Sequence, residues 1–119
     1  MFTLEYVTSR VGMSKSDGIV VNAVNDSTAS ENISIIIYDG ASVASDSGTL
    51  VVTPMTISGL GFTVPKNGDY WLRVRVTSEC LIVTASFERL HGGNFVPFLS
   101  YLPGDFAIFR LQPSKTRLW

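Results

Sequence analysis

The sequence predicts an all-β protein, an antiparallel β-sandwich of Ig-like or jelly-roll-like type with about eight or nine short strands and no substantial helix. Two observations predict this class. Apolar residues alternate with polar ones or form short β-branched runs, whereas helical periodicity is almost absent. These runs recur roughly every 8–14 residues and are separated by turn-forming segments. Since neither a fixed-period repeat nor a linker divides the chain, we expect one domain spanning residues 1–119.

The predicted strands follow the apolar runs along the whole chain. They lie near residues 2–9, 18–24, 32–38, 48–53, 56–64, 69–77, 80–89, 95–101 and 105–111. The intervening segments are rich in Asn, Asp, Ser, Gly and Pro, and they include YDGASVASDSG, VPKNGD and LPGD. Their Asp-Gly, Asn-Gly and Pro-Gly pairs provide the positive or preset φ angles that tight turns require, so these segments are suited to reverse the chain.

The sharpest local prediction is a hairpin over residues 69–88, which includes the segment YWLRVRVTS. Alternate residues in both halves are apolar, so a turn at residues 78–79 would place all the apolar side chains on one face. The predicted pairs are Val76 with Leu81, Val74 with Val83, Leu72 with Ala85, and Tyr70 with Phe87. A slip of one residue would destroy this agreement, and the pattern therefore predicts one register.

The opposite face of this hairpin is the first candidate binding surface. It carries Trp71, Arg73 and Arg75, together with Ile82, Thr84 and Ser86. Antiparallel sheets commonly leave one face in water, so a solvated face is one interpretation. Trp and Arg are also enriched in protein interfaces, and an aromatic ring beside guanidinium groups suits carboxylates or sugars. A subunit interface and a small-ligand site therefore stay open for Trp71, Arg73 and Arg75.

Charge is sparse and unevenly divided along the chain. Charged residues make up 16% of the sequence, against about 25% in typical domains, and the net charge is -1. Residues 1–65 hold two bases and six acids, whereas residues 66–119 hold seven bases and four acids. The opposite net charges of the two halves cancel if their strands interleave in one sandwich. Alternatively, the uneven charge serves head-to-tail contacts between subunits or binds an anionic ligand on the later half. The small net charge argues against a dedicated nucleic-acid-binding protein.

Few residues in the sequence are suited to catalysis or to metal binding. His91 is the only histidine and falls in a predicted turn. Cys80 is the only cysteine, which excludes an internal disulfide and a cysteine metal cluster, and Glu79 beside it offers no positive setting for a nucleophile. The spacings of calcium-binding and phosphate-binding loops are missing as well. We therefore expect no enzymatic activity, no metal and no cofactor.

The sequence also bears on location. It opens on MFTLEYVTSR, which alternates like a strand and does not resemble a secretory leader. No apolar run approaches the roughly 18–20 residues that a membrane span needs. A soluble, cytoplasmic protein without membrane insertion is therefore the expectation.

The C-terminal third is rich in aromatic residues. The segment FVPFLSYLPGDFAIF is followed by the tail LQPSKTRLW. The last Trp of this tail would expose a large apolar side chain to water unless it docks on its own domain or on a neighbouring subunit. This aromatic content exceeds what the end of a small domain needs for its core, and we therefore expect a homo-oligomer. The candidate interface residues are Phe95, Phe98, Tyr101, Phe106, Phe109 and Trp119.

Four segments within residues 18–90 carry a family resemblance: IVVNAVND, NISIIIYD, FTVPKNGDYWLRV and CLIVTASFERL. Together they resemble the sensory rhodopsin transducer family of small bacterial β-sandwich proteins. The resemblance implies a cytoplasmic oligomer, a tetramer in that family, which carries signals by binding partners and has been considered for ligand or DNA binding. The C-terminal aromatic segment departs from the family pattern, and no partner-binding residue matches one to one.

The function predicted from these observations is a non-catalytic interaction module that forms a homo-oligomer and binds a partner protein or a small ligand, with a role in signalling on the family resemblance. Two other functions fit the same sequence. One is a structural subunit of a larger bacterial or phage assembly, for which loops rich in Ser and Thr and few charges are equally suited. The other is a carbohydrate-binding module, with Trp71 and Tyr101 as stacking rings.

Overall fold

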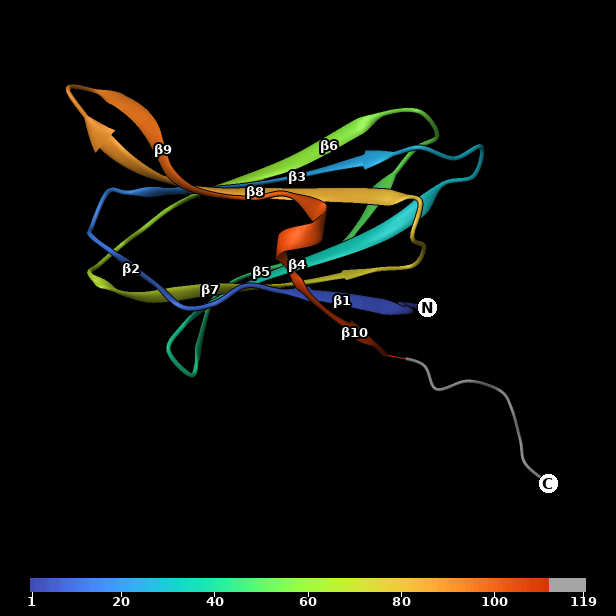
Figure 1. The fold of residues 1–119 in the computed structure, drawn as a ribbon, viewed down its shortest axis with the longest axis horizontal. Coiled ribbons are helices and arrows are strands. Elements are labelled where there is room, and N and C mark those ends of the chain that lie inside the picture. The colour runs from blue at the N-terminus through green and yellow to red at the C-terminus, as the bar shows by residue number, and fades with distance from the viewer. Residues whose placement is uncertain (112–119) are drawn as a thin grey trace.

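The computed structural model describes residues 1–111, which form two antiparallel β-sheets packed face to face (Figure 1). The helical content of these residues is a single 3₁₀ turn, η1, at Pro103–Asp105. The predicted all-β sandwich without substantial helix is thus confirmed. Among the described residues, no helix is both long and apolar enough to cross a membrane.

The described residues contain ten strands. They are β1 Leu4–Val7, β2 Val11–Met13, β3 Gly18–Asn25, β4 Glu31–Asp39, β5 Ser42–Val52, β6 Ile57–Thr63, β7 Gly68–Val76, β8 Leu81–His91, β9 Asn94–Tyr101 and β10 Ala107–Arg110. Each of the nine predicted strands corresponds to one of these, and β2 is additional. β1 and β2 both pair with β7 and are separated at Thr8, whose hydroxyl accepts a 3.0 Å hydrogen bond from the Leu72 amide. The hydroxyl replaces a backbone acceptor there, which the sequence pattern did not reveal.

The ten strands divide into a large and a small sheet. The order in the large sheet is β10-β1-β7-β4-β5, with β2 also pairing with β7. The order in the small sheet is β6-β3-β8-β9. The inner face of each sheet carries the alternate apolar residues of its strands, and packing the two inner faces together removes these side chains from water.

β7 and β8 supply the centre of the core, one from each sheet. Their eight alternate apolar residues are all buried, at most 4% exposed, and they are Tyr70, Leu72, Val74, Val76, Leu81, Val83, Ala85 and Phe87. Burial raises the pKa of the Tyr70 hydroxyl, and the charge of Asp39 adds to this effect. The same hydroxyl donates a 2.8 Å hydrogen bond to the Lys66 carbonyl, so this polar group is satisfied inside the core.

The predicted hairpin over residues 69–88 is wrong. β7 lies in the large sheet between β1 and β4, and β8 lies in the small sheet between β3 and β9. Residues 77–80 therefore carry the chain from one sheet to the other, and the apolar sides of β7 and β8 face each other across the core. Alternation determines which side chains point inward, but pairing within a sheet and facing across a core satisfy the same alternation.

This correction also divides the predicted outer face in two. Trp71, Arg73 and Arg75 lie on the outer face of the large sheet. The other three predicted members lie on the outer face of the small sheet, on the opposite side of the sandwich, and they are Ile82, Thr84 and Ser86. The six side chains therefore do not form one surface.

Aromatic packing closes one long edge of the sandwich, where η1 leads from the small sheet to the large one (Figure 1). Phe106 is 6% exposed, and its ring centroid lies 5.7 Å from that of Tyr6 and 5.3 Å from that of Tyr101. Burial raises the pKa of the Tyr6 hydroxyl, with a smaller contribution from the charge of Glu79. Part of the C-terminal aromatic segment therefore belongs to the core of its own domain.

Candidate functional site

Trp71, Arg73 and Arg75 lie on the outer face of β7, as their alternation with the buried residues requires. β7 has neighbours on both sides in the large sheet. In register, Arg75 pairs with Glu5 of β1 and Trp71 pairs with Tyr38 of β4. Three distant segments thus bring five side chains together, and we call them the arginine cluster: Glu5, Tyr38, Trp71, Arg73 and Arg75.

The aromatic part of the arginine cluster is a stacked pair. The ring centroids of Trp71 and Tyr38 are 4.2 Å apart and the ring planes differ by 12°. The Trp71 Nε1 donates a 2.7 Å hydrogen bond to the Gly40 carbonyl. The guanidinium carbon of Arg73 lies 5.4 Å from the Tyr38 centroid and 5.6 Å from the Trp71 centroid, within the roughly 6 Å range of cation–π contacts. Its Nη1 also donates to the Tyr38 hydroxyl at 3.2 Å.

The charged part of the arginine cluster is built around Glu5, whose side chain is 9% exposed. Its Oε2 lies 3.0 Å from the Nε of Arg75 and 3.2 Å from the Nε of Arg73. The Arg75 contact is a hydrogen bond, whereas the Arg73 contact is an ion pair without hydrogen-bond geometry. An unpaired carboxylate at this depth would cost several kcal/mol, so Glu5 needs a cation beside it. One net positive charge is left over for the surface.

The arginine cluster therefore uses much of its own binding capacity inside the monomer. The indole N–H, both Nε groups and one face of the Trp71 ring are engaged by neighbouring side chains or backbone. What faces solvent is a rigid, aromatic and weakly positive patch. The two rings of the carbohydrate hypothesis, Trp71 and Tyr101, lie on different sheets, and Tyr101 packs edge-on against Phe87 at 6.0 Å.

The structure separates the interface candidates of the C-terminal third. Three lie on the surface of β9 and β10, with exposures of 47%, 41% and 53%, and they are Phe95, Phe98 and Phe109. Tyr101 and Phe106 instead pack into the closed edge of the core, and Phe106 is too buried to serve an interface. Trp119 lies outside the described residues, and so does the predicted docking of the tail.

The end of β8 and the start of β9 form a two-stranded ribbon, residues 88–98, which we call the arm. It extends beyond the rest of the sandwich (Figure 1), and residues 91–100 are all exposed. Leu90 pairs with Phe95, and Arg89 pairs with Val96, so these two pairs lie on opposite faces of the ribbon. The arm thus exposes apolar side chains on both faces. Sequence reasoning missed Leu90 and Val96, because an apolar strand residue is ordinarily assigned to the core.

The base of the arm is anchored by Asp17, which is 3% exposed. Its carboxylate accepts hydrogen bonds from the backbone amides of Ser14 at 2.9 Å and Leu90 at 3.4 Å, and it lies 3.6 Å from the Arg89 Nε. The Arg89 guanidinium in turn covers the Phe98 ring at 4.1 Å. These contacts tie the base of the arm to the loop that precedes β3.

The remaining residues with catalytic potential lie apart from one another. His91 is exposed at the tip of the arm, and Cys80 is exposed between β7 and β8. Within residues 1–111, no group of three or more His, Cys, Asp or Glu side chains is placed to hold a metal ion. The surfaces of interest are therefore the arginine cluster and the arm.

Fold and surfaces together define a small antiparallel β-sandwich that carries a projecting apolar ribbon. No protein-family model matches the chain, and no curated protein matches it either. The crystal structure of Thermotoga maritima 1070 has a similar fold, with a TM-score of 0.64 over 85% of this chain and 92% of that chain. The two sequences are 10% identical, so the likeness concerns the fold alone.

Proposed function

We propose that the protein is a non-catalytic interaction module that forms a homo-oligomer through its arm. The observation that carries this proposal is the exposure of apolar side chains on both faces of the arm. Among the described residues, four of the fifteen exposed large hydrophobic side chains belong to the arm, and they are Leu90, Phe95, Val96 and Phe98. Single exposed apolar side chains are ordinary, but several of them gathered on one projecting ribbon are typical of an interaction surface, so burial against another chain is the role that the arm fits best.

The energy available from the arm is sufficient for association. Phe95, Val96 and Phe98 are each between 41% and 47% exposed. Covering what is left of one such side chain contributes roughly 1 kcal/mol, since complete burial contributes about 1.5–3 kcal/mol. Because the contacts of Asp17 and Arg89 tie the base of the arm to the sandwich, part of the ordering entropy that opposes this gain is avoided.

A second copy of the chain is the partner that best suits this surface. β10, an edge strand of four residues, adds the exposed Ile108 and Phe109 at the border of the large sheet. Unpaired strand edges with apolar side chains favour contact between copies, and a two-fold axis brings identical patches together. The low share of charged residues, 16%, is consistent with part of the surface being covered.

The family resemblance of residues 18–90 supports the same proposal from the side of the sequence, since it implies an oligomer that passes a signal to a partner protein. In that case the arginine cluster is the surface that stays available for the partner. It combines Trp71 with Arg73 and Arg75 in fixed positions, and Trp and Arg are the residues that dominate binding energy in protein interfaces.

Multi-angle light scattering of the full chain tests self-association. We expect a defined small oligomer, and we expect the Val96→Ser/Phe98→Ser variant to become a monomer with an unchanged circular dichroism spectrum. The matched control is Val43→Ser/Val51→Ser, because these two valines of β5 are 57% and 61% exposed but lie far from the arm in the sheet order. This control should keep the mass of the original chain.

Two results would contradict the proposal. The first is a monomeric mass at every concentration up to the millimolar range. The second is an open-ended increase of mass with concentration, which would favour a structural subunit of a larger assembly instead.

A further inference from the structure

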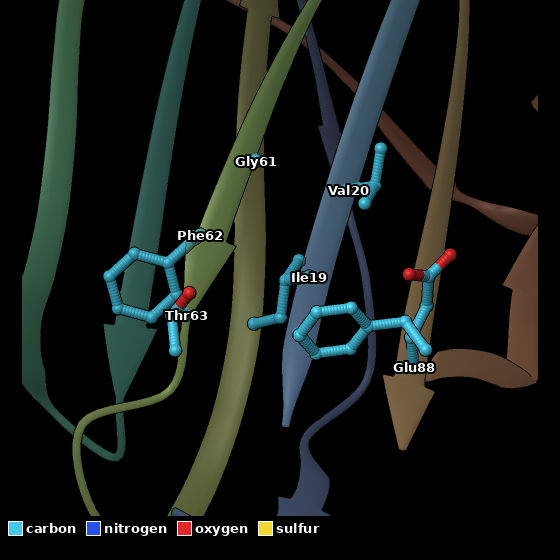
Figure 2. A pocket seen from close by; sticks show the side chains of 8 residues that line it. Ile19, Val20, Gly61, Phe62, Thr63 and Glu88 are labelled. Atoms are coloured by element: carbon cyan, nitrogen blue, oxygen red, sulfur yellow. The ribbon is translucent and has the colours of Figure 1, made fainter. Parts of the chain in front are cut away.

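The outer face of the small sheet is almost free of charge. Along β6, β3 and β8, its outward-facing positions hold Gly, Ser, Thr, Asn and aliphatic residues, with Glu88 as the single ionisable side chain. A pocket of about 140 Å³ opens at the Glu88 end of this face (Figure 2). Figure 2 shows Glu88 of β8 on one side of the pocket and Thr63 of β6 on the other, with β3 running between these two strands. Neither the arginine cluster nor self-association accounts for this feature.

Two glycines create the pocket. A Cβ atom on Gly18 would lie 3.1 Å from two atoms of the Phe95 ring, so the ring rests directly on the Gly18 backbone. A Cβ atom on Gly61 would meet nothing within 4 Å, so the space above Gly61 is open. Larger residues at these two positions of β3 and β6 would push the ring away or fill the space. The lining is mainly apolar, with the Glu88 carboxylate at its border.

Glu88 is the unusual member of this lining. Its Oε2 accepts a 3.2 Å hydrogen bond from the Ser86 hydroxyl. Among the described residues, no Lys, Arg or His nitrogen lies within 4.0 Å of its carboxylate. Among the other acids that are partly or fully buried, Glu5, Asp17 and Asp39 each have a cation within that distance. Glu31 resembles Glu88, since it accepts a hydrogen bond from a hydroxyl group and has no cation within 4.0 Å among the described residues, but it does not border the pocket. Glu88 is thus a partly buried negative charge whose counter-ion the described chain does not supply.

We propose that this pocket binds a cationic group, an alkylammonium or alkylguanidinium carried on an unbranched aliphatic stem. The Glu88 carboxylate supplies a charge-assisted hydrogen bond to the cation. The Phe95 ring supplies a cation–π contact at the same border of the pocket. The stem packs against Val20 and the backbone of Gly61, which matches the way aliphatic stems of basic side chains cover apolar surface. An anion is repelled by Glu88, and a sugar finds too few hydrogen-bond partners in this lining.

A cationic group on an aliphatic stem can come from two sources. One is a small free cation, and the other is a Lys or Arg side chain of a protein. The chain itself offers the second source in residues 112–119, which contain Lys115 and Arg117 and lie outside the described residues.

Nuclear magnetic resonance titration of the full chain with n-butylammonium chloride and with n-butylguanidinium chloride tests the pocket. We expect binding with a dissociation constant on the order of 1 mM, with shifts concentrated at the amides of Gly18, Gly61 and Glu88. Raising the salt concentration should weaken it, because the ion pair is partly exposed to solvent. Chemical-shift changes spread evenly over the surface would overturn the proposal, and so would the lack of a saturable change in both the original chain and the Lys115→Gln/Arg117→Gln variant described below.

Three variants separate the contributions. Glu88→Gln removes the counter-ion and Gly61→Val fills the open space, and each should weaken binding at least tenfold. Phe95→Leu keeps an apolar wall without the ring and should weaken binding about two- to fivefold. The control is Glu79→Gln, which removes an exposed carboxylate outside the pocket and should leave the affinity unchanged. Equal affinity for the original chain and Glu88→Gln would refute the assignment.

The Lys115→Gln/Arg117→Gln variant distinguishes the sources. If the tail occupies the pocket, this variant should bind n-butylammonium more tightly than the original chain does. If the pocket receives a free cation, the two proteins should bind equally. Both results support a cation pocket, and the lack of binding in both proteins refutes it. Light scattering of Glu88→Gln and Gly61→Val should show the mass of the original chain, so self-association and cation binding are tested separately.

Discussion

The two outer faces of the sandwich differ in how they treat charge. The large sheet carries the dense charge of the arginine cluster, where Glu5 forms ion pairs with two guanidinium groups and one face of the Trp71 ring is covered by Tyr38. The small sheet carries one carboxylate, Glu88, in a face of glycines, small polar residues and aliphatic side chains. By residue type alone, the face of the large sheet resembles a binding site, whereas the face of the small sheet is inconspicuous.

The comparison teaches that the number of charges on a surface is a poor guide to what the surface can bind. A guanidinium group already paired with a carboxylate must lose that partner, or share it, before it binds a ligand. A lone carboxylate beside an open pocket has its binding capacity unused. The internal contacts of the arginine cluster therefore stiffen the large sheet, whereas Glu88 of the small sheet has no cation beside it among the described residues and borders the proposed cation pocket. The following substitutions test this contrast.

The largest effect is expected for Glu5→Gln in the arginine cluster. It leaves Arg73 and Arg75 close together without their shared anion, and it should lower the free energy of unfolding by roughly 2–3 kcal/mol. This is less than the 3–5 kcal/mol typical of fully buried pairs, because both guanidinium groups are partly exposed and screened. Urea denaturation measures it, with the exposed Glu79→Gln as control. A loss below 0.5 kcal/mol, about the scatter of ordinary surface substitutions, would show that the cluster does not stabilise the sheet.

A smaller effect is expected for Trp71→Phe in the same face. The Phe ring can keep the stacking on Tyr38 but cannot donate the 2.7 Å hydrogen bond to the Gly40 carbonyl. We expect a loss of about 1 kcal/mol, the ordinary contribution of one hydrogen bond. Thermal unfolding measures this, and Trp71→Ala, which removes the ring as well, should lose more. Equal losses for both variants would mean that the stack contributes nothing.

On the small sheet, Gly61→Val should stabilise the protein by about 0.5 kcal/mol. A β-branched residue suits a strand better than glycine does, and the space above Gly61 is open. The matched control is Gly59→Val, two residues earlier on the same face of β6, where an added Cβ atom would lie 3.2 Å from the backbone carbonyl oxygen of Val21 and would also displace the Asn22 side chain. That control should destabilise the protein. A loss of stability in Gly61→Val would show that the pocket is already filled.

The smallest effect on stability is expected for Glu88→Gln. Because no described residue pairs with this carboxylate, its neutralisation should change the free energy of unfolding by less than about 0.5 kcal/mol. Chemical denaturation beside Glu5→Gln makes the comparison direct. If Glu88→Gln lowered the free energy of unfolding nearly as much as Glu5→Gln does, Glu88 would already have a cation beside it in the native protein. The two faces would then not differ in how their carboxylates are paired.

Alternation in the sequence was a sound guide to burial. The inward positions of β7 and β8 were predicted correctly, and so was the outward direction of Trp71, Arg73 and Arg75. The period of two in a strand directly encodes which side chains share a face, so this information is local. The same pattern predicted the wrong strand pairing for residues 69–88. Apolar residues along one side of a strand are buried equally well against a neighbouring strand of the same sheet and against the opposite sheet.

The candidate sites show the same division. Trp71, Arg73 and Arg75 were found from their types and spacing alone. Their partners Glu5 and Tyr38 were not, because strand pairing brings them from segments about 70 and 35 residues away. The pocket at Glu88 left no signal in the sequence, since it depends on glycines of two neighbouring strands and on the fold of the arm over one of them.

The sequence by itself thus determined the all-β class, the positions of nine strands and the inward face of each central strand. These follow from local alternation and turn residues, whose effects extend over only a few positions. Only the tertiary structure decided which strands pair, which charges find partners and which apolar residues of the C-terminal third stay exposed. These outcomes depend on contacts between distant segments, and no local pattern records which segment a strand will meet.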